Sequence, residues 1–277
     1  MESDLLACYR CKRPVDGVGT IRCLQCSATM EVGDDRIEAK SDSLMAQAYG
    51  ERYRLWRLLQ NNGVIAYLTH PPSSLSVDTR ADVRAFADML AAYRGRVLDV
   101  GAGPLELPGY LQPLVGAAGT TLYGLDPLPP LQGAARKRYI QVTSYSEMMP
   151  FRDHAFDVIV YGTSLDHSVA PLDSLRESHR VLRPGGGVVV WMSDNSKSRR
   201  RRWKAGWRRF ARRLRGRNVV QTVDDSLMLL VPAGAVDAFH TYHEDPATVA
   251  GWLAQAGFRN VTTDYRDRDH VYLRAAR

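Results

Sequence analysis

A short apolar strand that runs directly into a glycine-rich turn constrains the fold of this chain more than any other feature. Residues 96–100 lead into Gly101 and Gly103, and a second apolar run at 122–125 ends in Asp126. Glycine lets the backbone turn sharply at the end of a strand and approach a ligand closely. An acid at the end of the next strand accepts hydrogen bonds from ribose hydroxyls. The pattern therefore predicts an α/β fold that binds a nucleoside at the carboxyl ends of its strands.

The turn lacks the third glycine of the dinucleotide fingerprint, because position 106 is Glu106 and a helix is expected from about Leu105. That glycine allows the helix whose N-terminus holds the pyrophosphate to pack closely on the strand. Its absence argues against NAD and favours a ligand that carries a nucleoside without phosphates.

Further short motifs follow in a fixed order along the chain. They are Asp99-Val100-Gly101-Ala102-Gly103, Asp126, Met149-Pro150-Phe151, Phe156-Asp157-Val158-Ile159-Val160 and Val181-Leu182-Arg183-Pro184-Gly185-Gly186. Together they resemble the class I S-adenosylmethionine-dependent methyltransferases (type 11-like) over residues 97–276. The resemblance implies a Rossmann-like, seven-stranded α/β sheet with helices on both faces, whose last two strands form an antiparallel hairpin.

The resemblance also implies which residues bind S-adenosylmethionine. Asp99 would help to shape the pocket for the amino-acid end of the cofactor, and Asp126 would hold the ribose. For both acids, the alternative is a strand-end side chain that only caps a turn. The full expected set is Asp99, Gly101, Ala102, Gly103, Asp126, Pro127, Tyr145, Ser146, Glu147 and Thr163.

The adenine contact departs from the family pattern. The family usually has an acid followed by a small residue just before the segment that corresponds to 148–151. Tyr145 and Ser146 occupy those positions here. Ring stacking or a hydroxyl group would have to replace the missing carboxylate.

Apolar runs and helical spacing predict the order of elements in the core. The early strands are short continuous apolar runs, as expected for parallel strands buried on both faces. Asp245 followed by Pro246 is a typical helix start, and Gly257 a typical helix end. Strands are expected at 97–100, 121–125, 139–142, 158–161, 188–192, 260–265 and 271–275, and helices at 174–182 and 246–257.

All four cysteines lie in the first 26 residues, as two Cys-x-x-Cys pairs. Four thiolates at this spacing suit a tetrahedral Zn²⁺, and a closed set of four ligands is structural. Short strands at 20–22 and 28–32 would complete a zinc ribbon. Disulfides or free thiols are the alternative. A cytoplasmic location disfavours disulfides, and thiols used only for core packing would not all cluster in one short segment. The expected ligands are Cys8, Cys11, Cys23 and Cys26.

The domain organisation follows from these motifs. A zinc ribbon is expected over 1–35 and the methyltransferase core over 96–277. Helical spacing over 36–95 predicts a helical linker that covers the cofactor, although its aromatic residues Tyr49, Tyr53 and Trp56 are better explained by core packing. The gap between the fifth strand and its helix predicts a basic lid insertion at about 193–244, on the side of the sheet where open α/β folds bind ligands.

The net positive charge of the chain comes from one stretch within this insertion. Lys197 to Arg217 contains twelve of the 37 bases and no acid, so the rest of the chain has 25 bases against 30 acids. Within it, aromatic and leucine side chains recur at helical spacing, with arginines around them. This composition allows three interpretations. The stretch could form an amphipathic helix on anionic lipid, a surface for RNA phosphates, or a solvated helix packed on the domain. The recurring residues are Trp203, Trp207, Phe210 and Leu214.

Two segments supply candidates for catalysis. Asp166 and His167 follow the fourth strand, and either could accept a proton from a substrate hydroxyl. His240 and His243 end the insertion and are the second candidates for a base or a substrate contact. This pair could also bind a metal ion, but no third ligand is evident from the sequence.

Taken together, these features predict an enzyme that methylates a hydroxyl of a saccharide, a lipid-linked saccharide or another small molecule. RNA base methylation is the first alternative, and a non-catalytic zinc-ribbon scaffold is the second. The chain has no apolar run long enough to span a membrane, and its first four residues do not resemble a signal peptide. A cytoplasmic protein is expected, with peripheral association at the inner face of the membrane through 197–217.

Overall fold

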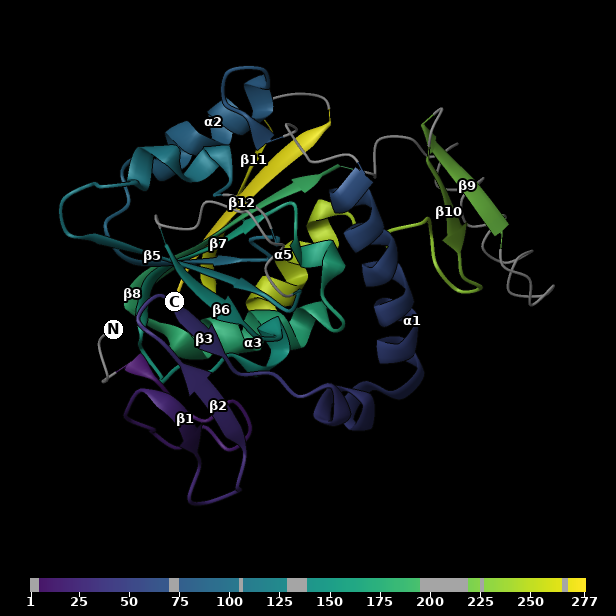
Figure 1. Cartoon of the computed structure of the whole chain (residues 1–277). Coiled ribbons are helices and arrows are strands. Elements are labelled where there is room, and N and C mark those ends of the chain that lie inside the picture. Colours follow the sequence, from purple (N-terminus) through teal and green to yellow (C-terminus); the bar gives the residue numbers. More distant parts are fainter. Residues whose placement is uncertain are drawn as a thin grey trace.

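The computed structural model describes residues 5–69, 75–104, 107–128, 139–194, 219–224, 227–265 and 269–277. Its centre is a sheet with helices on both faces, which confirms the expected α/β Rossmann-like fold (Figure 1). All seven strands expected for the core are present, in the spatial order β6-β5-β4-β7-β8-β12-β11. Their bounds are β4 (Gly95–Val100), β5 (Thr120–Asp126), β6 (Ile140–Thr143), β7 (Phe156–Gly162), β8 (Leu182–Ser193), β11 (Arg259–Tyr265) and β12 (His270–Ala276).

Most of the central strands are parallel, and their side chains are buried on both faces of the sheet. The neighbours from β6 to β8 pair in parallel, and β12 is antiparallel to both β8 and β11. Val97 and Leu98 point to opposite faces of β4, and neither side chain is exposed. Burial on both faces accounts for the continuous apolar runs in the sequence. The expected antiparallel hairpin at the end of the chain is confirmed.

The amino-terminal segment extends this sheet. Strands β1 (Gly19–Arg22), β2 (Thr29–Val32) and β3 (Arg36–Glu38) join it where β3 pairs in parallel with β6, which gives ten strands in all. Residues 36–38, expected to be helical, therefore form a strand instead. Ile37 is fully buried opposite Val142, while its two neighbours face outward. A strand of three residues is too short to show a recognisable apolar periodicity in the sequence.

Two helical layers cover the sheet. On one face Leu175 and Leu253 belong to the main hydrophobic core, which also includes residues of the amino-terminal segment. On the other face Phe86 and Tyr110 belong to a second core (Figure 1). Pro171 begins its helix three residues before the expected start, because proline is favoured in the first turn. The helices are α1 (Asp42–Thr69, broken at Gly50), α2 (Ala81–Leu90), α3 (Pro171–Val181) and α5 (Pro246–Gln255), with 3₁₀ turns η3 (Gly109–Leu114), η4 (Ser146–Met148) and η5 (Leu165–His167).

The described part of the insertion forms a small hairpin beside the long helix α1. Strands β9 (Val219–Asp224) and β10 (Leu227–Val231) make a separate two-stranded sheet. Leu227 and Leu229 pack with Leu59 of α1 in a small core of their own. The Asn62 side chain donates hydrogen bonds to the carbonyl oxygens of Leu230 (2.8 Å) and Ala238 (2.7 Å). These contacts hold the insertion against α1.

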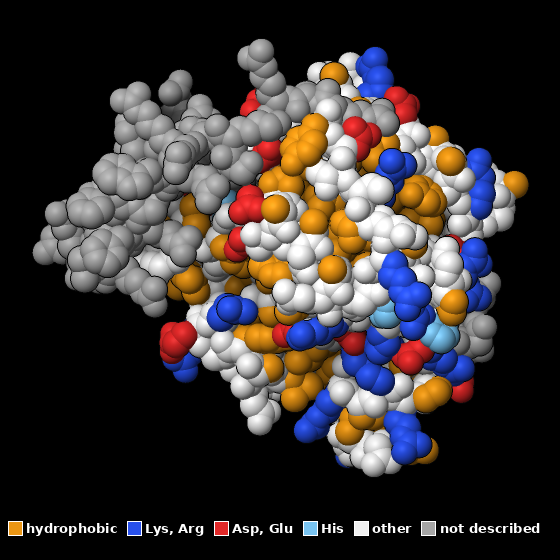
Figure 2. Space-filling view, turned by 180° about the vertical axis from the view of Figure 1, so that it is seen from behind, with side chains coloured by type: hydrophobic (Ala, Val, Ile, Leu, Met, Phe, Trp, Pro, Cys, Tyr) orange, Lys and Arg blue, Asp and Glu red, His pale blue; other side chains and the backbone are white. Residues whose placement is uncertain are grey.

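The basic stretch 197–217 lies outside the described residues. On the face shown in Figure 2, basic and acidic side chains of the described residues are intermixed among hydrophobic ones. None of the helices in the described ranges is both long enough and apolar enough to cross a membrane.

Candidate active site

The glycine turn at the end of β4 has a backbone that requires glycine. Gly101 and Gly103 have φ angles of 80° and 77°, in the left-handed region. A Cβ atom on Gly101 would lie 2.3 Å from the Cβ of Ser164, so the space beside it is already filled. The N–H of Gly101 donates to the carbonyl of Leu125 (2.7 Å), as does that of Ala102 (3.2 Å). The turn is thus tied to the end of the neighbouring strand β5.

Asp126 completes this arrangement at the end of β5. Its Oδ2 accepts a hydrogen bond from the N–H of Gly103 (2.9 Å), and its Oδ1 accepts one from the N–H of Leu128 (2.8 Å). The carbonyl of the half-buried Pro127 accepts a hydrogen bond from Lys40 (3.1 Å). The acid and the glycines that the sequence singled out therefore meet at one edge of the sheet.

Asp99 is buried beneath this turn. Both of its carboxylate oxygens accept from the hydroxyl of Tyr110 on η3, at 3.1 and 3.0 Å. Burial raises the pKa of Asp99 to about 7, because the Tyr110 hydrogen bond lowers it less than burial and the negative charge of Asp126 raise it. This carboxyl group can therefore change its ionisation near neutral pH. Tyr110 was not among the residues predicted from the sequence, and its apolar surroundings gave no signal for this role.

Tyr145, expected beside adenine, packs among the aromatic residues of α1. Its hydroxyl donates to Asp42 (2.6 Å) and lies 2.8 Å from the hydroxyl of Tyr53. Its ring lies edge-on to that of Trp56, with centroids 5.6 Å apart. Tyr53 and Trp56 are buried in the same cluster, as the core-packing interpretation predicted.

The neighbouring polar residues of the expected cofactor set face η5 and α3. Glu147 is buried, which raises its pKa, and its carboxylate accepts from the backbone N–H of Ala170 (2.9 Å). The hydroxyl of Ser146 donates to the same carboxylate (3.1 Å). Thr163 has a φ of 57°, and its N–H donates to the carbonyl of Trp191 (2.9 Å).

The structure brings together all four residues proposed from the sequence for catalysis. Asp166 and His167 on η5 meet His240 and His243, which follow the hairpin of the insertion. Asp237 joins them, and its carboxylate lies 2.8 Å from both His240 Nδ1 and His243 Nε2. We call these five residues the histidine–aspartate cluster. Sequence reasoning missed Asp237, although the spacing Asp-x-x-His-x-x-His could have indicated it.

The charges within this cluster are unevenly balanced. Burial lowers the pKa of His240, but its hydrogen bond to Asp237 and the negative charge of Asp166 outweigh burial and raise the pKa overall. Burial also lowers the pKa of His167, and the charge of Asp166 does not compensate for it. The two histidine hydrogen bonds hold the pKa of Asp237 far below its usual range, although burial acts in the opposite direction. The raised pKa of His240 favours its protonated ring, and the lowered pKa of Asp237 keeps this carboxylate ionised beside it.

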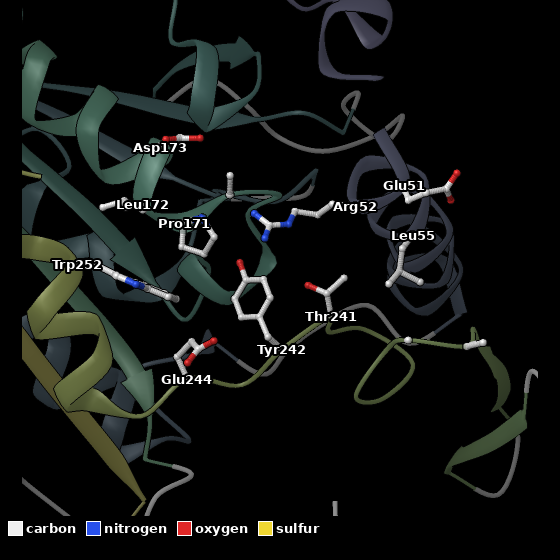
Figure 3. A pocket seen from close by; sticks show the side chains of 13 residues that line it. Glu51, Arg52, Leu55, Pro171, Leu172, Asp173, Thr241, Tyr242, Glu244 and Trp252 are labelled. Atoms are coloured by element: carbon white, nitrogen blue, oxygen red, sulfur yellow. The ribbon is translucent and has the colours of Figure 1, made fainter. Parts of the chain in front are cut away.

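A cavity of about 990 Å³ is lined by Thr241, Tyr242 and Glu244, the sequence neighbours of His240 and His243, although the cluster itself is not part of its wall. Figure 3 shows the Arg52 side chain reaching from α1 toward Pro171 and Tyr242. Tyr242 stands between His240 and His243 in the sequence, and its hydroxyl donates to the carbonyl of Ser168 (2.6 Å). The walls come from α1, the start of α3, the segment 233–244 and α5. They include Glu51, Arg52, Leu55, Pro171, Leu172, Asp173, Thr241, Tyr242, Glu244 and Trp252.

The four cysteines form a second cluster of possible ligands, in the amino-terminal segment that contains β1 and β2. The Sγ atoms of Cys8 and Cys26 are 3.5 Å apart, as are those of Cys11 and Cys23, and all four lie within 4.8 Å of one another. Four thiolates around one Zn²⁺ would be separated by about 3.8 Å. The side chains present therefore fit a tetrahedral metal ion, and none of these cysteines forms a disulfide.

The two Cys-x-x-Cys pairs have the same backbone geometry. The residue after each pair, Lys12 or Ser27, has a φ near 60° (61° and 59°) and donates its N–H to the carbonyl of the first cysteine at 2.9 Å. Burial raises the pKa of the Cys8 thiol to about 12. For Cys23, backbone N–H groups and neighbouring thiols outweigh burial and lower the pKa to about 6.

Comparisons with known proteins place these features in a family context. Residues 98–190 match the family model of the methyltransferase domain. The demethylmenaquinone methyltransferase of Chlorobaculum parvum is 33% identical over 98 residues, which cover 34% of this chain and 39% of that protein. The ubiquinone/menaquinone biosynthesis C-methyltransferase of Coxiella burnetii is 31% identical over 104 residues, covering 34% and 41%. The similarity thus spans about two fifths of the length of these relatives.

Solved structures show the same fold over more of the chain. A Burkholderia thailandensis 1,6-didemethyltoxoflavin-N1-methyltransferase, with bound 1,6-didemethyltoxoflavin and S-adenosylhomocysteine, has a TM-score of 0.51 and 16% identity, covering 94% of this chain and 99% of that one. A Haloferax volcanii complex between the Trm112 methyltransferase activator and a methyltransferase has a TM-score of 0.52 and 14% identity, covering 76% and 96%. The chain therefore has the α/β fold of S-adenosylmethionine-dependent methyltransferases.

Proposed function

We propose that this chain transfers a methyl group from S-adenosylmethionine to a small molecule bound in the cavity of Figure 3. The observation that carries the proposal is the junction of the glycine turn and Asp126 at the same edge of the sheet as the histidine–aspartate cluster. The methyltransferase-domain match over 98–190 covers this junction and β7. S-adenosylmethionine, when bound, supplies a methyl group activated by its sulfonium, so the protein mainly has to position the acceptor and receive a proton.

In this proposal the chain holds the cofactor through the residues at the ends of β4 and β5. Asp126 exchanges its hydrogen bond from Gly103 for the ribose hydroxyls, and the glycine turn allows close approach of the backbone. Asp99 and Tyr110 support the turn from below. Ser146, Glu147 and Thr163 are the remaining polar groups that we assign to the rim of this pocket.

For the acceptor we propose a hydroxyl of a saccharide, a lipid-linked saccharide or a related small molecule. The cavity wall combines apolar surface from Trp252 and Leu55 with polar groups such as Arg52 and Tyr242. A hydroxyl acceptor has to lose a proton, and the adjacent histidine–aspartate cluster is suited to receive it. Carbon methylation of a hydroxylated ring, suggested by the names of the curated relatives, has the same requirement and is the second candidate.

We propose that the cysteine cluster holds a structural Zn²⁺. The cysteines would bind it as thiolates in a closed set of four, which leaves no position for a substrate. Cys8 and Cys23 belong to the main hydrophobic core, together with Phe151 and Val142 of the methyltransferase core. The metal would thus stabilise the edge of the sheet beside β6.

We also propose that the basic stretch 197–217 binds an anionic surface, with a lipid membrane preferred and RNA as the alternative. Its twelve bases without an acid support this proposal. Replacing Arg199 to Arg202 by serine should abolish association with anionic liposomes and leave cofactor binding intact. If the unaltered protein associates with neither liposomes nor RNA, this part of the proposal is wrong.

Cofactor binding is the first test. Titration calorimetry should detect binding of S-adenosylhomocysteine, and Asp126→Ala should weaken it about 10- to 100-fold, because hydrogen bonds to a charged group are lost. Asp88→Ala, which removes an exposed acid of α2, is the matched control and should bind normally. A chain that does not bind S-adenosylhomocysteine would contradict the proposal and favour a non-catalytic scaffold.

The acceptor class can be found with methyl-labelled S-adenosylmethionine and a fractionated cell lysate. Label in the small-molecule, lipid or glycan fraction is the expected result. Label in RNA would contradict the proposed acceptor and favour RNA base methylation.

A further inference from the structure

We infer that Asp166, His167 and His240 form a binding site for a divalent transition-metal ion at the edge of the acceptor cavity. The three side chains offer one carboxylate oxygen and two ring nitrogens, which all lie within 4.8 Å of one another. Two histidines and one carboxylate that leave other positions open are a recurrent ligand set for divalent iron and related ions. Metal binding does not depend on the proposed function, but its role in activating the acceptor does.

The distances are close to those that a bound ion needs. His240 Nε2 lies 3.6 Å from one oxygen of Asp166, and His167 Nε2 lies 4.0 Å from the other. The rings of His167 and His240 have centroids 4.4 Å apart. Ligand atoms about 2.1 Å from a common ion lie roughly 3 to 3.5 Å apart. Side-chain adjustments of about 1 Å would bring the three ligand atoms, now within 4.8 Å of one another, to these separations.

Asp237 fixes His240 in the form that binds a metal. Its carboxylate lies 2.8 and 3.0 Å from His240 Nδ1, so this nitrogen carries the proton and donates it. When the ring is neutral, or when an ion displaces its second proton, His240 Nε2 is free to bind a metal on the side of Asp166. Asp237 Oδ1 also accepts from the backbone N–H groups of Phe239 (2.8 Å) and His240 (2.9 Å), which locks its position. A carboxylate that orients a ligand histidine in this way is typical of metal sites.

The charges of the cluster call for a cation. Asp166 and Asp237 are two carboxylates that share three histidines, and neither pairs with a lysine or arginine in the part of the chain that the structure describes. Their side chains are only 32% and 25% exposed. A divalent ion would replace the protonated His240 ring as the positive charge that balances these partly buried carboxylates.

The backbone around the ligands is held from two sides. The indole N–H of Trp56 on α1 donates to the carbonyl of His167 (2.5 Å). The hydroxyl of Tyr242, from the insertion, donates to the carbonyl of Ser168. These bonds tie the backbone at His167 and Ser168 to α1 and to the insertion, so the backbone that carries two of the ligands is held in place before an ion binds, which favours affinity.

The position of the site suggests its use. Asp166 lines a narrow pocket of about 20 Å³, whose other walls include Tyr242 and Trp252. Tyr242 and Trp252 also line the large cavity. An acceptor in the cavity would therefore reach the ion past these side chains. A bound cation lowers the pKa of a hydroxyl that coordinates it. With His167 and His240 occupied as ligands, the proton then leaves to solvent instead of passing to these rings.

The metal alone tests this inference. The full chain is first loaded with one equivalent of Zn²⁺, enough for the cysteine cluster alone, because four thiolates bind this ion more tightly than two histidines and a carboxylate. It is then titrated with Co²⁺. Uptake of one Co²⁺ per chain is expected, with ligand-field absorption and without the intense charge-transfer band of thiolate ligands. No uptake, or a thiolate band, would contradict the inference.

Variants assign the ligands. His240→Ala and His167→Ala should abolish the Co²⁺ signal, and Asp237→Asn should weaken binding about 10- to 100-fold, as is usual for a residue that orients a ligand. His154→Ala, at an exposed histidine that belongs to neither cluster of possible metal ligands, is the matched control and should bind normally. An unchanged signal in His240→Ala would contradict the inference, and loss of the signal in His243→Ala would assign the ion to Asp237, His240 and His243 instead.

Folding and cofactor binding are followed in parallel. Each variant should retain the circular dichroism spectrum of the unaltered chain and, if the proposed function holds, should bind S-adenosylhomocysteine equally well. Failure to bind S-adenosylhomocysteine in all forms would overturn the proposed function without affecting the Co²⁺ result. For a variant that misfolds, His240→Gln provides the same test with less disturbance of packing.

Discussion

The cysteine cluster and the histidine–aspartate cluster are both suited to metal ions, but they are built in opposite ways. The cysteines come from one short segment, and Cys8 and Cys23 are buried in the main hydrophobic core. The histidines come from two distant segments, and His167 and His240 remain 38% and 20% exposed beside a cavity. A closed, buried set of ligands stabilises a fold, whereas an open set on a cavity rim can meet a substrate. The difference predicts that damage to the first cluster appears in stability and damage to the second in activity.

The largest effect is expected from the cysteines. The double variant Cys11→Ser, Cys26→Ser should lower the free energy of unfolding by more than about 4 kcal/mol, because metal binding to such a set contributes directly to folding. Urea denaturation measures this change. The control Leu24→Ser alters a fully exposed side chain between the cysteines and should change stability by less than about 0.5 kcal/mol. A small effect of the double variant on the free energy of unfolding would contradict the proposal that this cluster has a structural role.

The second cluster should give the reverse result. His240→Ala should lower kcat/KM about 100-fold or more, since the group that activates the acceptor is lost. Its free energy of unfolding should fall by no more than about 1 to 2 kcal/mol, the contribution of one charged hydrogen bond. Steady-state kinetics and urea denaturation on the same preparation separate the two quantities, with exposed His154→Ala as the reference. Equal losses in both would contradict the comparison.

Lys12 tests how the cysteine segment supports the rest of the chain. Its Nζ lies 2.6 Å from Glu177 on α3 and donates to the carbonyl of Met149 (3.3 Å). Burial lowers the pKa of Lys12, and the charge of Glu177 partly offsets this. Lys12→Met should cost about 1 to 2 kcal/mol of stability, because Arg180 still pairs with Glu177. Arg13→Met, at an exposed neighbour, should be close to neutral in the same denaturation experiment.

Asp99 gives a pH-dependent test that leaves both clusters intact. Its pKa of about 7 means that the carboxyl is mainly protonated at pH 6 and mainly ionised at pH 8. A positively charged cofactor favours the ionised form, so its binding should release a proton and strengthen as the pH rises. The affinity for S-adenosylmethionine should increase several-fold, to at most about tenfold, between pH 6 and 8.

Calorimetry in buffers of different ionisation enthalpy measures that proton release. Asp99→Asn should bind with little pH dependence over the same range. A pH-dependent affinity in this variant would assign the titration to another group.

Much of the core was predictable because its signals are local. The glycine turn, Asp126 and the seven core strands were expected from short patterns, and the structure contains each of them. Buried parallel strands have to be continuously apolar, and a tight turn has to use glycine. Each of these features can therefore be recognised from a few consecutive residues. Strand β3 was missed because three residues carry no recognisable period. Tyr110 was missed because its contact with Asp99 joins a strand to a 3₁₀ turn that no motif marks.

The sequence by itself determined the fold class, the glycine turn and the grouping of the four cysteines, because each depends on residues that are close together in the chain. It also named Asp166, His167, His240 and His243 as separate candidates. Only the tertiary structure decided that these four meet, that Asp237 orients one of them, and that the amino-terminal strands continue the central sheet. Contacts between distant segments depend on how the layers pack, and packing is a property of the whole chain rather than of any short pattern within it.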